Sequence, residues 1–217
     1  MRAGWEWKRC GSRYTISEDG LVATMGGPLP NPHGPGDEDY DEWFVEEPTQ
    51  LVTCGQPMTE GRHYWEVEFT RLISMRGDVL FGAVRPSQDC DDSGDVRPSS
   101  TSLFCIHSGG FAVALRGNGK SGNPYSPGCD GNVSHVDEGA QYIFEQGDRI
   151  GCLLDLDAGW LRFYRNGVRM RQEYASGVTG PLLRFLEVTD EGAVWTALPG
   201  AEPPVDEARA DAASGRD

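Results

Sequence analysis

The feature that most constrains the fold is a recurrence of short apolar or alternating runs along most of the chain, separated by Gly, Pro, Asn and Asp. Helical periodicity is nearly absent, and runs of about four to seven residues between turn formers predict β-strands. Many short strands at close spacing favour an antiparallel sandwich or barrel over a βαβ fold. We expect strands at residues 14–16, 21–24, 51–54, 63–69, 79–84, 103–106, 111–115, 142–144, 150–156, 160–165, 168–170, 182–188 and 193–198.

The run at residues 63–69 shows why these segments are interpreted as strands. Trp65, Val67 and Phe69 alternate with polar side chains, so they fall on one face of an extended chain. That pattern predicts a half-buried strand with its aromatic face toward the core.

Residues 150–170 predict a three-stranded meander. A Gly-containing loop separates the runs 150–156 and 160–165, and Asn166-Gly167 follows the second run directly. Asn-Gly is a strong hairpin signal because both central positions of a type I′ turn require positive φ.

The length of 217 residues fits one domain with tails. We place a β-sandwich domain at residues 1–198, with an acidic loop insertion at residues 26–48. Residues 199–217 are rich in Ala, Pro, Asp, Glu and Arg, with Val205 as the only large apolar residue, which predicts a disordered tail.

The net charge of −15 argues against a nucleic-acid binder and against docking on anionic lipid. Its simplest role is to keep the protein soluble. The six cysteines form no CxxC pair, and we find neither a secretory signal nor an apolar membrane span. We therefore expect reduced thiols and a cytoplasmic or nuclear protein.

One motif imitates a phosphate-binding loop. The stretch LRGNGKSG at residues 115–122 ends in Gly-Lys-Ser-Gly, but Ala114 stands where a Walker A loop needs its first glycine. Asn123 and Pro124 follow, so no helix can begin there to face phosphate. We interpret the segment as a surface loop.

Another motif imitates a calcium loop. Residues 89–96 (DCDDSGDV) place oxygen-bearing side chains at loop positions 1, 3, 5 and 7, with Gly at position 6. Ser100 replaces the bidentate Glu at position 12, and Pro98 precedes it, which excludes an EF-hand. A looser calcium or magnesium site is the alternative to an acidic turn stabilised by its own side chains.

The sequence contains no arrangement of residues that is typical of an enzyme active site. A G-x-S-x-G nucleophile elbow is missing, and the histidines at positions 33, 63, 107 and 135 stand in unrelated contexts. We expect no catalysis and no cofactor.

Three motifs, taken together, resemble the signature of the SPRY domain family. They are GRHYWEVE at residues 61–68, FGAV at 81–84, and GDRIGCLLD at 147–155, the last continued by WLRFYRNG at 160–167. The similarity extends over roughly residues 5–198. The preceding PRY segment of longer relatives is not evident, and the 26–48 insertion is longer and more acidic than a typical first loop.

The resemblance implies an all-β fold, a bent sandwich of two antiparallel sheets of the concanavalin-like jelly-roll type. It also implies a non-catalytic module that binds a partner protein or peptide through variable loops at one end. The signature residues would then serve folding more than binding; they are Gly61, Trp65, Gly147, Asp148, Gly151, Asp155, Phe163, Asn166 and Gly167.

Binding residues are expected in three loops, because loops on a rigid scaffold usually carry recognition. Aromatic side chains interleaved with acids make good anchors, and the choice falls on Asp39, Tyr40, Glu42, Trp43, Phe44, Glu47, Asn118, Lys120, Tyr125, Thr189 and Asp190. Trp43 and Phe44 could instead fold back and cap the core. We expect a monomer whose partner carries basic or polar residues; a metal- or carbohydrate-binding sandwich is the alternative.

Overall fold

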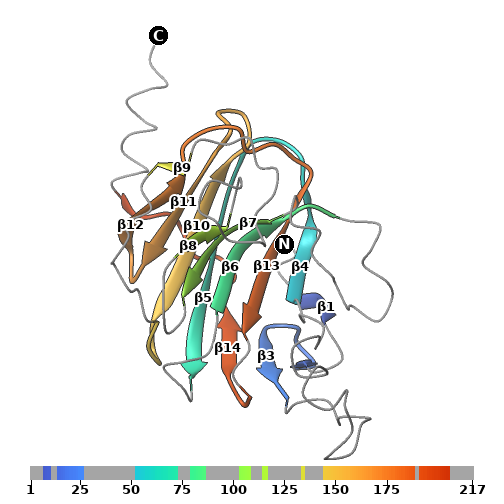
Figure 1. Cartoon of the computed structure of the whole chain (residues 1–217). Helices are drawn as coiled ribbons and strands as arrows, with labels where there is room; N and C mark the ends of the chain where they lie inside the picture. Colours follow the sequence, from blue (N-terminus) through green and yellow to red (C-terminus); the bar gives the residue numbers. More distant parts are fainter. Residues whose placement is uncertain are drawn as a thin grey trace, which may run out of the picture.

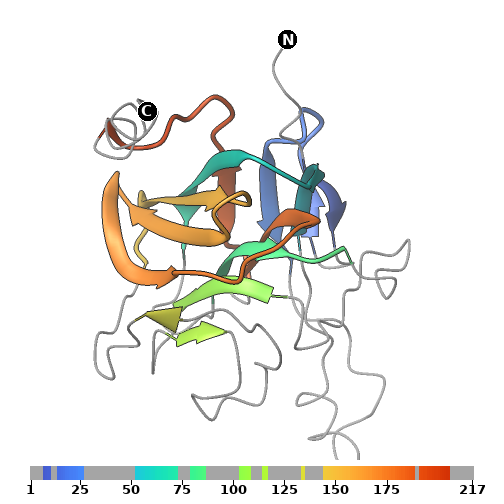
Figure 2. The same ribbon diagram turned by 90° about the horizontal axis from the view of Figure 1, so that it is seen from above.

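The computed structural model describes residues 7–10, 14–26, 52–72, 79–86, 103–108, 114–116, 133–134, 144–188 and 191–205. These residues form two antiparallel sheets that pack face to face, as Figures 1 and 2 show from two directions. The predicted antiparallel β-sandwich is confirmed.

One sheet has six strands in the order β1-β4-β13-β6-β7-β8. Its strands are β1 (Trp7–Cys10), β4 (Val52–Met58), β13 (Leu182–Val188), β6 (Val79–Val84), β7 (Leu103–Ser108) and β8 (Ala114–Arg116). Strand β13 lies between β4 and β6, so a strand late in the sequence closes the middle of this sheet.

The other sheet has eight strands in the order β2-β3-β14-β5-β10-β11-β12-β9. They are β2 (Tyr14–Ile16), β3 (Val22–Met25), β14 (Val194–Ala197), β5 (Arg62–Arg71), β10 (Arg149–Asp155), β11 (Trp160–Arg165), β12 (Val168–Tyr174) and β9 (Val133–Ser134). Strands β10, β11 and β12 follow one another in space, which confirms the predicted meander.

The core fills the space between the sheets and is rich in aromatic side chains. Trp65 on β5 and Trp195 on β14 are almost completely buried. The Tyr14 ring meets Trp195 edge to face with centroids 5.4 Å apart, and Phe104 meets Tyr174 at the same distance. Such pairs stabilise the core beyond the area they bury, so the inward face of each strand is fixed by large, directional contacts.

The observed strands differ from the predicted ones mainly at their ends. Strands β1 and β9 were not expected, and β12 continues to Tyr174, beyond its predicted end at residue 170. Phe144 was assigned to a strand, but it precedes a turn, and its ring stacks on Phe69 with centroids 5.7 Å apart. Its apolar character therefore reflects core packing at a turn, not strand pairing.

The sandwich has two distinct ends. The upper end carries the turns at residues 59–61 and 156–159, and the lower end carries the turns at 145–148 and 166–167 (Figure 1). Strand register assigns the remaining connections to one end or the other, because all pairings are antiparallel. Among the described residues, no helix is long and apolar enough to cross a membrane.

Candidate functional site

The strands that flank the acidic insertion in the sequence, β3 and β4, have their facing ends at the lower end of the sandwich. Met25, at the end of β3, donates its N–H to Ala193 O at 2.9 Å and accepts from Gly192 N at 2.8 Å. The chain re-enters the structure at β4, where Val52 pairs with Leu186 on β13 toward the same end. The insertion therefore leaves and returns at the end of the sandwich that also carries the β13–β14 connection.

All of the predicted binding residues lie outside the described residues; they are Asp39, Tyr40, Glu42, Trp43, Phe44, Glu47, Asn118, Lys120, Tyr125, Thr189 and Asp190. The strand ends that bracket them are described. In the sequence, the first six residues fall between β3 and β4 and the last two between β13 and β14; the described ends of these strands that face the two gaps lie at the lower end. Strand β8 runs antiparallel to β7, so the chain leaves Arg116 toward the upper end, ahead of Asn118.

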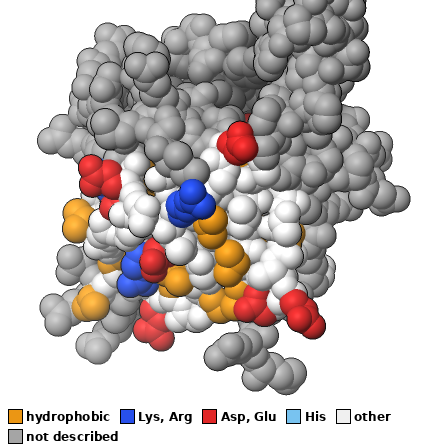
Figure 3. All heavy atoms as spheres, turned by 90° about the horizontal axis from the view of Figure 1, so that it is seen from below, with side chains coloured by type: hydrophobic (Ala, Val, Ile, Leu, Met, Phe, Trp, Pro, Cys, Tyr) orange, Lys and Arg blue, Asp and Glu red, His pale blue; other side chains and the backbone are white. Residues whose placement is uncertain are grey.

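Both acidic and basic side chains are exposed on the described part of the lower end. Figure 3 shows acidic groups around its margin with basic groups between them. Some of these charges are neutralised locally: the Arg149 guanidinium donates to the buried carboxylate of Glu66, and Arg165 pairs with Asp148 at 2.6 Å. Glu145 is 73% exposed at its side chain and lies 3.7 Å from Arg165, and Glu191 is also exposed. These two exposed carboxylates are therefore accessible to a partner.

A buried carboxylate ties two lower-end turns together. Asp148 accepts hydrogen bonds from Glu145 N and from Asn166 Nδ2, both at 2.8 Å. Asn166 in turn accepts from Arg149 N at 2.8 Å. The Gly-Asp and Asn-Gly parts of the signature thus meet in space and hold the start of β10 against the end of β11.

The Asn166-Gly167 turn has the backbone that its sequence predicts. Asn166 has φ 52° and Gly167 has φ 76°, both in the left-handed region that Asn and Gly tolerate. Gly151 is required for a different reason, because a Cβ built there would lie 2.2 Å from the Tyr64 hydroxyl. These signature residues serve the fold, and we assign none of them to partner binding.

The upper-end connections are tied to one another by backbone and carboxylate hydrogen bonds. Gly61 donates its N–H to Asp157 Oδ1 at 3.0 Å and accepts from Leu156 N at 3.0 Å. Gly159 O accepts from Val178 N at 2.9 Å, which adds the connection between β12 and β13. Hydrogen bonds therefore join the β4–β5, β10–β11 and β12–β13 connections into one upper-end platform.

Beside this platform, arginine side chains surround a tryptophan on the outward face of the eight-stranded sheet. The Arg162 guanidinium carbon lies 4.0 Å from the centroid of the Trp160 ring, and that of Arg62 lies 5.2 Å from it. Asp155 on β10 pairs in register with Arg62 on β5 and with Trp160 on β11, and its carboxylate is 3.5 Å from Arg62 Nε. Both guanidinium groups are within cation–π distance of the same indole.

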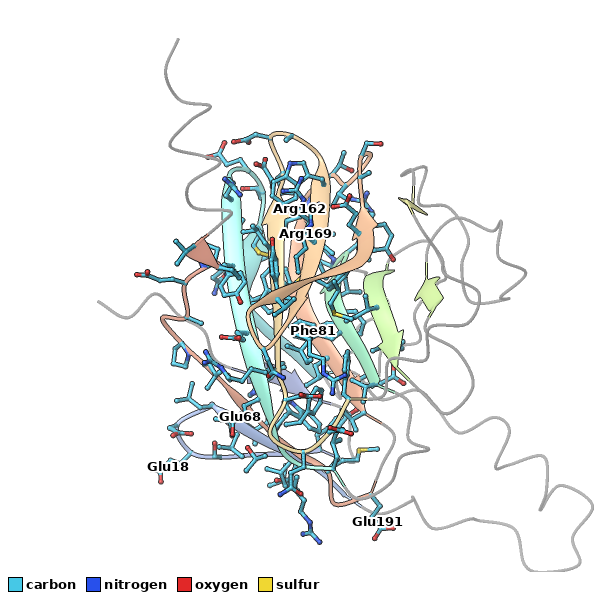
Figure 4. All side chains as sticks on the ribbon, turned by 90° about the vertical axis from the view of Figure 1, so that its left-hand side faces the viewer. Glu18, Glu68, Phe81, Arg162, Arg169 and Glu191 are labelled. Atoms are coloured by element: carbon cyan, nitrogen blue, oxygen red, sulfur yellow. The ribbon has the colours of Figure 1, made fainter. Side chains whose placement is uncertain are left out.

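The arginines continue onto strand β12. Glu173 accepts from Arg162 Nε at 3.1 Å and also from the Arg169 guanidinium, so one carboxylate serves two cations. Figure 4 shows Arg162 and Arg169 close together, toward the opposite end from Glu18 and Glu191. We call Arg62, Asp155, Trp160, Arg162, Arg169 and Glu173 the Arg–Trp cluster.

The pKa values of two side chains, Tyr64 and Asp19, differ from their ordinary values. Burial, with the nearby charge of Glu66 as a smaller cause, raises the pKa of Tyr64 well above the ordinary tyrosine value. Hydrogen bonds from the Ser17 hydroxyl and then from Leu21 N lower the pKa of Asp19 below its ordinary value. Neither group is arranged for proton transfer: the Tyr64 hydroxyl covers Gly151, and Asp19 stabilises the turn between β2 and β3.

Metal ligation finds no support in the described part of the chain. No group of three or more His, Cys, Asp or Glu side chains converges among the described residues. The calcium-like stretch at residues 89–96 lies outside them. His63 lies on β5 as expected, and its Nε2 is 2.8 Å from Glu60 O.

The Arg–Trp cluster was missed as a candidate site. The alternation in β11 carried a signal for it, because Leu161 and Phe163 point inward and so place Trp160 and Arg162 on the polar face. A tryptophan among the polar side chains of that face is unusual, and it could have marked Trp160 as a candidate functional residue. Its contact with Arg62 depends on the β5–β10–β11 strand order, which no short motif encodes.

Comparisons with known proteins identify the architecture. The family model described as the SPRY domain matches residues 62–184, which include nearly all of the signature motifs. The crystal structure of the TRIM65 PSpry domain superposes with a TM-score of 0.54 at 16% identity, covering 90% of this chain and 92% of that one. The SPRY domain of human HERC1 gives 0.51 at 12% identity, covering 92% and 99%. No curated protein sequence shows significant similarity.

Proposed function

Because the chain belongs to the SPRY domain family, whose members are generally protein-interaction modules, we propose that it binds a partner protein or peptide without catalysis through loops at the lower end of the sandwich. The fold supports this proposal, because the signature residues form turns and core. The 26–48 insertion, by contrast, differs from the family pattern and is free to serve binding.

The observation that carries the proposal is the pair of hydrogen bonds between Met25 and the 192–193 backbone. They hold the start of the acidic insertion beside the turn that follows β13. We therefore propose that Tyr40, Trp43 and Phe44, with their neighbouring acids, form one face together with Thr189 and Asp190. Asn118, Lys120 and Tyr125 follow a strand that ends toward the upper end, so we assign them to a separate, secondary contact.

The chemistry of this face indicates a partner with basic or polar residues. The stretch 37–47 holds seven acidic residues and no basic one, and the exposed carboxylates of Glu145 and Glu191 lie at the same end. Attraction between such a face and a basic segment is screened by salt. Affinity is therefore expected to fall as ionic strength rises.

We further propose that the protein works as a monomer in the cytoplasm or nucleus. Cys152 is a buried free thiol in the core, which fits a compartment that keeps thiols reduced. Sedimentation analysis at micromolar concentration would show a single species of the mass of one chain; a dimer would contradict the monomer proposal alone.

Affinity capture with the intact chain and with a Tyr40→Ala/Trp43→Ala variant tests the proposal. Circular dichroism first establishes that both are folded, and Val205→Ala serves as the control because it truncates an exposed apolar side chain outside the three predicted binding loops. We expect a specific protein on the intact chain and on the control but not on the double variant. Retention by all three would place the site elsewhere, and the absence of any specific partner would contradict an interaction module.

A further inference from the structure

A small apolar cluster lies on the outward face of the eight-stranded sheet, separate from the core between the sheets. Its members are Tyr64 on β5, Leu153 on β10 and Tyr164 on β11, each of which alternates along its strand with core residues. The Tyr64 and Tyr164 rings meet edge to face with centroids 6.2 Å apart. They meet across Gly151, which pairs in register with Tyr164 and has no side chain. We call Tyr64, Leu153 and Tyr164 the outer tyrosine cluster.

The outer tyrosine cluster is shielded from water although it lies outside the core. Leu153 is 2% and Tyr164 1% exposed, and Glu66 on the same face is 4% exposed. The outward face of an antiparallel sheet is usually solvated, so burial on this scale requires a covering layer. The described segment that crosses this face is residues 198–205, drawn in red on the side of the sheet away from the six-stranded sheet (Figures 1 and 2). We call this segment the C-terminal strap.

The C-terminal strap is attached to the sheet at its first residue. Leu198 donates its N–H to Glu66 O at 3.0 Å, which continues the pairing of β14 with β5. Ala201 N then donates to Leu198 O at 3.2 Å, and Gly200 has φ 87°, a value that glycine tolerates without strain. The chain therefore turns immediately after β14, and the turn directs the following residues across the outward face.

Beyond this turn, apolar packing holds the C-terminal strap in place. Pro203 and Pro204 are partly buried, whereas Glu202 is exposed and Val205 is 66% exposed. Neither proline can donate a backbone hydrogen bond, and the hydrogen bonds of the strap to the rest of the described chain end at Leu198. A terminal segment held by a few apolar contacts detaches at a much lower free energy than the sandwich unfolds. The strap is therefore a removable cover.

The buried residues of the strap indicate which ligand this surface accepts. They form the pattern Ala-x-Pro-Pro at residues 201–204, in which the alanine and both prolines are partly buried and the residue between them is exposed. Proline-containing segments bind aromatic surfaces well because they are extended before they bind and lose little conformational entropy. We propose that the outer tyrosine cluster binds an extended Ala-x-Pro-Pro segment of a partner protein, which takes the place of the C-terminal strap. This surface is separate from the lower-end face, and its binding does not depend on that face.

The tethered strap competes with such a partner. A segment joined to its own site by a short linker acts at an effective concentration in the millimolar range. The apparent affinity for a partner is therefore reduced by the fraction of molecules whose strap is detached. Replacing Pro203 and Pro204 with glycine removes both rings and makes the strap more flexible, so it raises that fraction. A tenfold rise in the detached fraction lowers the apparent Kd about tenfold.

Fluorescence anisotropy with a labelled synthetic peptide tests the proposal. The probe is PGAEPPV, the sequence of residues 199–205, titrated with the intact chain, with a full-length Pro203→Gly/Pro204→Gly variant and with Val205→Ala. The last is the matched control, because it truncates an exposed apolar side chain of the same segment. We expect the double variant to bind the peptide about tenfold more tightly than the intact chain, and the control to bind it as the intact chain does. A photo-cross-linking group on the peptide should label β5, β10 or β11 of the double variant.

Circular dichroism and urea unfolding first establish that the double variant retains the folded sandwich. Equal peptide binding by the intact chain and the double variant overturns the proposal, as does the absence of binding to the double variant up to about 1 mM peptide. Cross-links confined to other parts of the chain overturn it as well. Dimers of the intact chain that the peptide dissociates would replace the partner protein with a second copy as the source of the segment.

Discussion

Replacing Asp148 with Ala removes the carboxylate that joins two lower-end turns. The side chain is buried and accepts from Glu145 N, Asn166 Nδ2 and the Arg165 guanidinium at 2.8, 2.8 and 2.6 Å. The substitution leaves the Asn166 amide without this acceptor, and it removes the Glu145 N hydrogen bond that closes the turn at residues 145–148.

The magnitude follows from the number and exposure of these contacts. A hydrogen bond to a charged group contributes about 1.5–3 kcal/mol, and the two bonds from Glu145 N and Asn166 Nδ2 are of this kind. The Arg165 side chain is 29% exposed, so its ion pair adds only about 0.2–1 kcal/mol. Because contacts in one network are not additive, we expect Asp148→Ala to lower the free energy of unfolding by about 2–4 kcal/mol.

Urea unfolding followed by tryptophan fluorescence measures this change, with the comparison made only if the denaturant slope is unchanged. Asp157→Ala is the matched control, because its carboxylate accepts an exposed hydrogen bond from Gly61 N at 3.0 Å. We expect the control to cost less than about 1 kcal/mol. If Asp148→Ala is no more destabilising than the control, the carboxylate does not hold the two turns and this reasoning is refuted.

Other predictions concern Gly151, Tyr64 and Asp19. Gly151→Ala should cost about 1–3 kcal/mol because its Cβ collides with the Tyr64 ring; in a Tyr64→Ala background the cost should largely vanish, and additive costs in urea unfolding would contradict the collision. Because the pKa of Tyr64 is raised in the folded state, stability should decline as the pH rises past the ordinary tyrosine value of about 10. Tyr64→Phe should lack this part of the alkaline decline, and an identical pH profile would exclude it. The lowered pKa of Asp19 depends first on Ser17, so Ser17→Ala should raise it in an NMR titration; an unchanged value would exclude the hydroxyl as its cause.

Much of the fold could be predicted from short stretches of sequence, because strand alternation and turn dipeptides are each encoded within a few residues. Alternation in the run around Trp65 and the Asn166-Gly167 dipeptide each specify one strand face or one turn, and the structure contains both. Gly151 was identified through the resemblance alone; its physical reason is a neighbour on another strand, Tyr64, which appears only once β5 and β10 are paired.

The remaining features depend on long-range pairing or on loops. Strand β1 pairs with β4, far along the chain, and β9 has only two residues, so neither carries a strong pattern of its own. Phe144 was misassigned because a core aromatic beside a turn has the same local signature as a short strand. The Arg–Trp cluster draws its members from four strands, and only strand order brings them together.

Hydrogen–deuterium exchange of the intact chain, with and without a captured partner, tests most directly whether binding takes place at the lower end. We expect the partner to slow exchange at residues 26–51 and 189–193, the segments whose ends the Met25 hydrogen bonds place beside one another. Exchange in the turns at 59–61 and 156–159 should stay the same. Protection confined to the upper-end turns and the Arg–Trp cluster would contradict the lower-end interaction face.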